Sequence, residues 1–196
     1  EESGAVKPEA CDPKGEAFTN TMPPPNATGN LHLGHAVMLA LEDIFIRFAR
    51  MKGKRALWIP GTDHAAIATE NVVIRNLQKG GMKDPRKELG REKLVEKIAA
   101  FVEESKSTIR GQIRKMGASC DWTRERYTFE PTLNRCVNEV FKKMYDDGLI
   151  YRGHRIVNWD SKLQTTVSDD EIEYKEETGV FYTFKYGPFE IATARP

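Results

Sequence analysis

Three consecutive prolines, Pro23–Pro25, constrain the fold of this chain more than any other feature, because they separate two segments of different periodicity. Proline lacks a backbone N–H and has a fixed φ, so the segment Met22–Asn30 can be neither a helix nor a central strand. Ahead of it, residues 17–21 are predicted to form a short strand. After it, apolar side chains recur at helical spacing over residues 33–48, which predicts an amphipathic helix of about 20 residues.

A second short strand is predicted at residues 55–59, so strand, loop, helix and strand follow one another as a βαβ unit. The same helical spacing predicts four further helices, at residues 69–77, 86–100, 102–116 and 132–147. Extended backbone is predicted where β-branched and aromatic residues concentrate, at residues 149–159, 180–186 and 189–194. The last two segments flank Gly187, which indicates a hairpin.

The composition excludes several classes of protein. Basic residues number 30 and acidic residues 29, so the net charge gives no overall attraction to a polyanion. A local excess of basic residues over 72–115 fits either contacts with the phosphates of a nucleic acid or an ordinary solvated surface. A membrane-spanning helix needs about 20 consecutive apolar residues, and every apolar run in this sequence is far shorter. Three cysteines without metal-ligand spacing favour a reducing compartment.

Two histidines, His32 and His35, stand three residues apart at the predicted start of the first helix, which places them on one face. The free N–H groups and the dipole of a helix N-terminus favour an anion such as phosphate. Gly34 between them leaves room for a flat base to approach the backbone. Two alternatives remain open: a pair of surface histidines, or a partial metal site with Asp63 and His64, whose spacing fits a metal poorly.

The segment from Pro23 to His35, PPPNATGNLHLGH, resembles the region around the HIGH signature of class I aminoacyl-tRNA synthetases. Residues 60–70, PGTDHAAIATE, are similar to the GTDHAGIATQ segment of the valyl branch of that family, and further matches extend the resemblance over about residues 20–196. It implies an α/β fold, namely the first half of a Rossmann-like catalytic domain with a helical excursion, followed by the first strands of an inserted editing domain.

The resemblance, together with a start of the chain that holds glycine, proline and charged residues without a period, implies a division of the chain. Residues 1–16 are expected to be a mobile leader, residues 17–178 the N-terminal half of the catalytic domain, and residues 179–196 the truncated start of the editing domain. The sequence contains neither a KMSKS-like segment nor anticodon-binding helices. We therefore expect the chain to be the N-terminal part of a longer enzyme.

The implied activity is that of a valine–tRNA ligase, which activates valine with ATP to valyl-adenylate and transfers the valyl group to tRNA(Val). The implied ligands and partners are ATP with Mg²⁺, valine and tRNA(Val), and the implied protein is a cytoplasmic monomer that does not contact a membrane. The alternative is that this chain by itself only binds a nucleotide or tRNA, without ligase activity.

The resemblance assigns the catalytic roles to His32 and His35, which would stabilise the α-phosphate and the leaving pyrophosphate through hydrogen bonds. Thr28 and Gly34 would join the two histidines in binding ATP, with Gly34 beneath the adenine.

The amino-acid site implied by the resemblance consists of Pro23, Pro24, Asn26 and Asp63. The two prolines would form a rigid apolar wall, and the two polar side chains would hold the ammonium of valine. Two alternatives remain open here: Asp63 caps the next helix, and the prolines are a plain linker. Thr193 would belong to the editing site.

Two departures from the valyl pattern bear on the expected site. A CxxC pair that binds zinc in many valyl enzymes is missing after Asn158 and Trp159, where the sequence reads DSKL, so no zinc site is expected. Ala66 and Glu70 also stand where the family segment has glycine and glutamine.

Overall fold

The computed structural model describes residues 3–195, and the chain divides into two compact units between Asp147 and Gly148. In chain order, the first unit contains η1 (Pro8–Ala10), β1 (Ala17–Thr21), α1 (Leu33–Met51), β2 (Arg55–Ile59), β3 (Gly61–Thr62), α2 (Ala66–Lys79), α3 (Pro85–Lys115), η2 (Trp122–Arg124), β4 (Arg126–Tyr127) and α4 (Pro131–Asp146). The predicted strands at 17–21 and 55–59 are confirmed with the same bounds.

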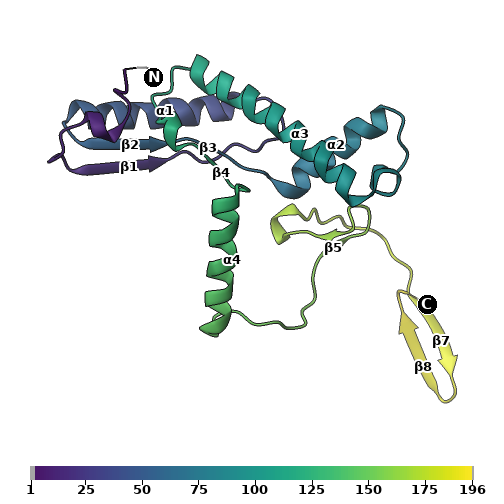
Figure 1. Cartoon of the computed structure of the whole chain (residues 1–196). Coiled ribbons are helices and arrows are strands. Elements are labelled where there is room, and N and C mark those ends of the chain that lie inside the picture. The colour runs from purple at the N-terminus through teal and green to yellow at the C-terminus, as the bar shows by residue number, and fades with distance from the viewer. Residues whose placement is uncertain (1–2, 196) are drawn as a thin grey trace. The chain divides into compact units, whose positions relative to one another are not determined.

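The strands β1 and β2 pair in parallel, from Ala17 opposite Arg55 to Thr21 opposite Ile59. Parallel neighbours need a crossover connection, which α1 supplies. Figure 1 shows α1 running along the two strands. The predicted βαβ unit is therefore confirmed, and the proline-rich loop leaves the carboxyl end of β1, where parallel α/β folds bind their ligands.

The chain continues from β2 into β3, which pairs in parallel with β4. This pairing extends past the strand ends, because Arg126 N donates to Pro60 O (3.0 Å) and Thr128 N donates to Thr62 O (3.1 Å). On the other side, Asp63 N donates to the carbonyl of Pro25 at 2.8 Å. The end of the β2–β3 segment thus lies between the proline-rich loop and residues 126–128.

The core of the first unit forms where α1 and α3 pack around Trp58. Its fully buried side chains include Leu39 and Ile46 of α1 and Ile109 and Ile113 of α3. Burial of the indole leaves its N–H in need of an acceptor, and Trp58 Nε1 donates to Glu42 Oε2 at 2.9 Å. Packing of this kind fixes the direction of α1, whose first turn carries the two histidines.

The prediction of two helices separated at Phe101 was wrong, because the structure has a single long helix, α3, in this region. The helix is continuous through Phe101, and the only non-helical residue inside it is Gly90, with φ 72°. A residue with a Cβ would be strained at this φ, so glycine permits the break. The helical excursion therefore bends near its beginning.

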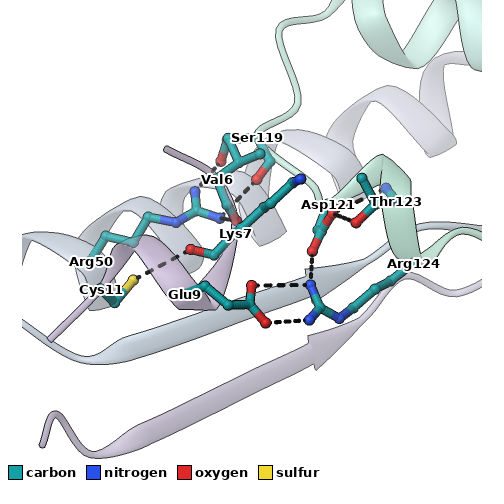
Figure 2. Close-up of polar contacts among 9 residues, drawn as sticks. All are labelled: Val6, Lys7, Glu9, Cys11, Arg50, Ser119, Asp121, Thr123 and Arg124. Carbon is teal, nitrogen blue, oxygen red and sulfur yellow. Dashed lines mark hydrogen bonds and ion pairs between the residues drawn. The ribbon is translucent and has the colours of Figure 1, made fainter. Parts of the chain in front are cut away.

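The expected leader, of which residues 3–16 are described, makes several contacts with the rest of the first unit (Figure 2). Glu9 and Asp121 both form ion pairs with Arg124. Arg50 Nη2 donates to Val6 O at 3.1 Å and to Ser119 O at 2.9 Å. The segment around η1 is thus held against α1 and η2, while the mobility of residues 1–16 in solution stays a prediction.

Asp121 is the buried centre of this network. Burial raises the pKa of its carboxyl, but hydrogen bonds from Thr123 and Arg124 outweigh that effect and hold the pKa below its ordinary value. The carboxylate therefore favours the folded state above about pH 4 and loses this contribution as the pH falls through its lowered pKa.

The second unit contains β5 (Trp159–Asp160), β6 (Thr165–Thr166), η3 (Asp169–Glu171), β7 (Tyr182–Tyr186) and β8 (Phe189–Thr193). The strands β7 and β8 pair antiparallel around Gly187, which confirms the predicted hairpin. Of residues 149–159, only Trp159 belongs to a strand. The expected domain boundary at 178/179 falls inside this unit and stays a prediction. Across residues 3–195, no helix has the length and apolar character needed to cross a membrane.

Candidate functional site

The first turn of α1 is capped by its two histidines. His32 is the N-cap residue and its Nδ1 accepts a hydrogen bond from Gly34 N at 3.1 Å. His35 caps the helix start in the reverse sense, since its Nδ1 accepts a hydrogen bond from His32 N at 3.3 Å. The two ring centroids lie 4.0 Å apart. Reciprocal caps of this kind satisfy N–H groups that a helix start otherwise leaves without partners.

These hydrogen bonds determine what the two rings offer to a ligand. A neutral imidazole carries one proton, so a ring whose Nδ1 accepts must hold that proton on Nε2. His32 and His35 therefore each present an Nε2–H donor. Burial, followed by the neighbouring His32, lowers the pKa of His35 below its ordinary value, which favours the neutral form. The pair is suited to hydrogen bonding with anionic oxygens.

Gly34 is required by the packing of His32. A Cβ built on Gly34 would lie 2.9 Å from His32 Cε1 and 3.1 Å from His32 Nδ1. Any larger residue would therefore push the ring away from its capping position. The predicted placement of Gly34 beneath an adenine ring stays a prediction.

A cavity of 330 Å³ opens between the proline-rich loop and the start of α1. It is lined by Pro23, Pro24, Pro25, Asn26, Thr28, Asn30, Leu31, His32, His35 and Met38. Gln112 of α3 supports one side of the loop, because its Oε1 accepts from Leu31 N at 2.8 Å. The structure thus brings six of the predicted site residues to one cavity, namely Pro23, Pro24, Asn26, Thr28, His32 and His35. Gly34 lies in the sequence between the last two of them.

Asp63 lies beside the loop but does not line this cavity. Its backbone forms an isolated parallel bridge with Asn26, in which Ala27 N donates to Asp63 O at 2.8 Å. The interpretation of Asp63 as a helix cap is wrong, because α2 begins at Ala66 and Ala65, with φ 47°, is its N-cap residue. The backbone bridge makes Asp63 and Asn26 neighbours, while their roles in an amino-acid site stay predictions.

Thr128 and Phe129, which contact Asp63 and His64, were not predicted from the sequence as members of the candidate site. Thr128 Oγ1 donates to Asp63 Oδ1 at 2.8 Å, and the ring of His64 stacks on Phe129 with a centroid distance of 5.1 Å. No sequence pattern connects Thr128 with Asp63, since only the pairing of β3 with β4 brings them together.

The remaining predicted features belong to the second unit or involve a metal. Thr193 belongs to the second unit, where its Oγ1 accepts from Arg195 N at 3.1 Å. Within residues 3–195, no group of three or more histidine, cysteine, aspartate or glutamate side chains is arranged to hold a metal ion. The alternative of a partial metal site at the histidines gains no support, and the expected lack of zinc stays a prediction.

Comparison with known proteins identifies the family. The family model described as tRNA synthetases class I (I, L, M and V) matches residues 1–186. The chain belongs to the class I tRNA synthetases. Within this family, it is 49% identical to the valine–tRNA ligase of Clostridium acetobutylicum over its whole length, and 50% identical to that of Caulobacter vibrioides over 95% of its length. It spans 23% and 20% of these two relatives.

A solved class I synthetase structure confirms the predicted α/β fold. The crystal structure of the ternary complex of Agrobacterium radiobacter K84 agnB2 LeuRS with tRNA and LeuAMS matches 88% of this chain and 20% of that chain. The TM-score is 0.69 at 23% sequence identity. The likeness therefore extends over most of the fold of this chain.

The cap made by His35 is expected to weaken in acid. A protonated ring has an N–H at Nδ1, which cannot accept from His32 N. Because the pKa of His35 is lowered in the folded state, its contribution to helix stability is complete above the ordinary histidine pKa of about 6.5 and is lost as the pH falls through the lowered value. Hydrogen exchange of the first-turn amides of α1, corrected for intrinsic rates, should accelerate over that range.

The control for this experiment is His35→Asn, whose amide oxygen accepts without titrating near neutral pH. We expect a smaller pH dependence of exchange in this variant. An equal pH dependence in both proteins would show that His35 does not titrate as part of the cap.

Proposed function

We propose that the longer protein containing this chain is a valine–tRNA ligase, which forms valyl-adenylate from valine and ATP and transfers the valyl group to tRNA(Val). The observation that carries the proposal is that His32 and His35, whose Nδ1 atoms accept backbone hydrogen bonds, line the same cavity as Pro23 and Pro24. The identities of 49% and 50% to valine–tRNA ligases support the choice of amino acid.

The two histidines act on the phosphoryl group. A carboxylate oxygen of valine attacks the α-phosphorus of ATP, the new O–P bond forms, and the bond from that phosphorus to the bridging oxygen breaks to release pyrophosphate. Negative charge grows on the phosphoryl oxygens during this step, and the Nε2–H groups of His32 and His35 donate to them. The protein supplies no nucleophile, so positioning and electrostatic stabilisation carry the catalysis.

The amino-acid site takes valine by its ammonium and its side chain. Asp63 and Asn26 hold the ammonium, a charge-assisted contact that also orients the carboxylate toward ATP. Pro23 and Pro24 form a wall whose rings cannot rotate away, which favours a small branched side chain over a larger one. Thr28 and Gly34 complete the ATP site.

Further parts of the proposal extend beyond the first unit. Thr193 contributes to an editing site, Mg²⁺ accompanies ATP, and the enzyme is a cytoplasmic monomer that needs no zinc in this segment. The resemblance to the valyl branch supports the editing site, the Mg²⁺ and the cytoplasmic monomer, whereas the missing CxxC pair after Trp159 supports the lack of zinc. No described contact favours the alternative that the chain is only a nucleotide- or tRNA-binding module.

The proposed function is tested by amino-acid-dependent exchange of pyrophosphate into ATP, measured on the full-length protein with valine, isoleucine and leucine. We expect valine to give the highest kcat/KM, exceeding isoleucine by at least about 10-fold, because the extra methylene must be forced against the proline wall. Preference for leucine or isoleucine, or no exchange with any amino acid, would contradict the proposal.

A further inference from the structure

Thr128 lies where three segments of the first unit meet. It follows β4, whose pairing with β3 places it beside Asp63, and its own N–H donates to Thr62 O at 3.1 Å. Asp63 is in turn bonded through its backbone to the carbonyl of Pro25. The backbone of Asp63 is therefore fixed by the proline-rich loop, whereas its side chain is contacted from the opposite side by Thr128.

We propose that Thr128 is a positioning residue for the amino-acid site. Its hydroxyl orients the Asp63 carboxylate for an ammonium ligand and selects the tautomer of His64. The part of this inference that concerns the ammonium rests on the proposed function. The hydroxyl acts through Asp63 and His64, without contact to the substrate.

The first step is the orientation of the carboxylate. An ionised carboxylate only accepts hydrogen bonds, so the single proton of the Thr128 hydroxyl is directed to Asp63 Oδ1 at 2.8 Å. His64 Nδ1 approaches the same oxygen at 3.3 Å. Both contacts are made at Oδ1, which leaves Oδ2 to face a cationic ligand. The hydrogen bond holds a half-buried side chain in one rotamer before the ligand arrives.

The second step is the proton on His64. The Thr128 hydroxyl oxygen also lies 2.9 Å from His64 N and 2.6 Å from His64 Nδ1. Because its own proton is used by Asp63, this oxygen must accept from both nitrogens, and Nδ1 of neutral His64 must carry a proton. The Nε2 atom of His64 is then an acceptor, whereas His32 and His35 present Nε2–H donors. The site is thus divided into a part that favours anions and a part that favours a cation.

The activity test uses Thr128→Val and Thr128→Ser in the full-length protein, with KM for valine and for ATP measured by pyrophosphate exchange. Valine replaces the hydroxyl with a methyl of similar size, and we expect it to raise the KM for valine by about 10-fold while the KM for ATP stays unchanged. Serine keeps the hydroxyl and should restore the KM for valine. Thr166→Val, at an exposed threonine of the second unit, is the matched control.

A spectroscopic readout separates this inference from the proposed function. The ¹⁵N shifts of the His64 ring, assigned with His64→Gln, should show a neutral ring protonated at Nδ1 in the wild type and the loss of that preference in Thr128→Val. This result is expected even if the wild type shows no valine-dependent exchange, an outcome that would overturn only the proposed function. An Nε2-protonated ring in the wild type, or equal KM values for valine in Thr128→Val and the wild type, would overturn the positioning role.

Discussion

Replacing His35 by asparagine in the full-length protein is expected to lower kcat for valine-dependent pyrophosphate exchange by about 100-fold, the usual effect of removing one donor that stabilises a growing oxyanion. Asparagine places an acceptor near the position of Nδ1, so the hydrogen bond from His32 N that caps α1 can be kept. It has no N–H at the position of Nε2. The variant therefore removes the catalytic donor without the loss of about 1 kcal/mol that follows removal of a helix cap.

Two matched variants make this result specific. Glutamine at position 35 extends an amide N–H toward the position of Nε2, so His35→Gln should retain more activity than His35→Asn. His154→Ala, at an exposed histidine of the second unit, should leave kcat unchanged. If His35→Asn and His35→Ala each lose less than about tenfold, the electrostatic role assigned to His35 is wrong.

Asp63→Asn is expected to raise the KM for valine by roughly 10- to 100-fold, since a hydrogen bond to a charged group contributes about 1.5–3 kcal/mol. The asparagine side chain has the shape of the aspartate and keeps an oxygen that can accept from Thr128, but it cannot neutralise an ammonium. The KM for ATP should change little, because Asp63 does not line the cavity beside the histidines.

The control for charge alone is Asp170→Asn, which removes an exposed carboxylate of the second unit and should leave both KM values unchanged. Steady-state exchange at varied valine and at varied ATP separates the two constants. A defect confined to ATP in Asp63→Asn would contradict the assignment of Asp63 to the ammonium.

Local sequence patterns predicted the βαβ unit because the signals there are strong. The prolines exclude regular structure at Pro23–Pro25, and α1 has continuous helical spacing. The break in α3 could not be placed in the same way. Gly90 and Gly111 both lie within that helix, but only Gly90 has a positive φ. Spacing of apolar residues carries no information about the φ that tertiary packing imposes on a single glycine.

The candidate site could be predicted only where its geometry follows from residues that are close together in the sequence. His32 and His35 are recognisable because a separation of three residues places them on one face of the first turn. Their reciprocal caps follow from that same separation, yet only the structure shows which ring nitrogen accepts. Thr128 could not be found, because β3 and β4 have two residues each and their pairing leaves no periodic signal.

The most direct test of the account is the structure of the full-length protein bound to a non-hydrolysable analogue of valyl-adenylate. We expect the Nε2 atoms of His32 and His35 to lie within about 3 Å of the group that replaces the phosphate. The ammonium of the analogue should lie at Oδ2 of Asp63, with its isopropyl group against Pro23 and Pro24. An analogue bound away from the proline-rich loop, or an ammonium held by a different carboxylate, would contradict the account.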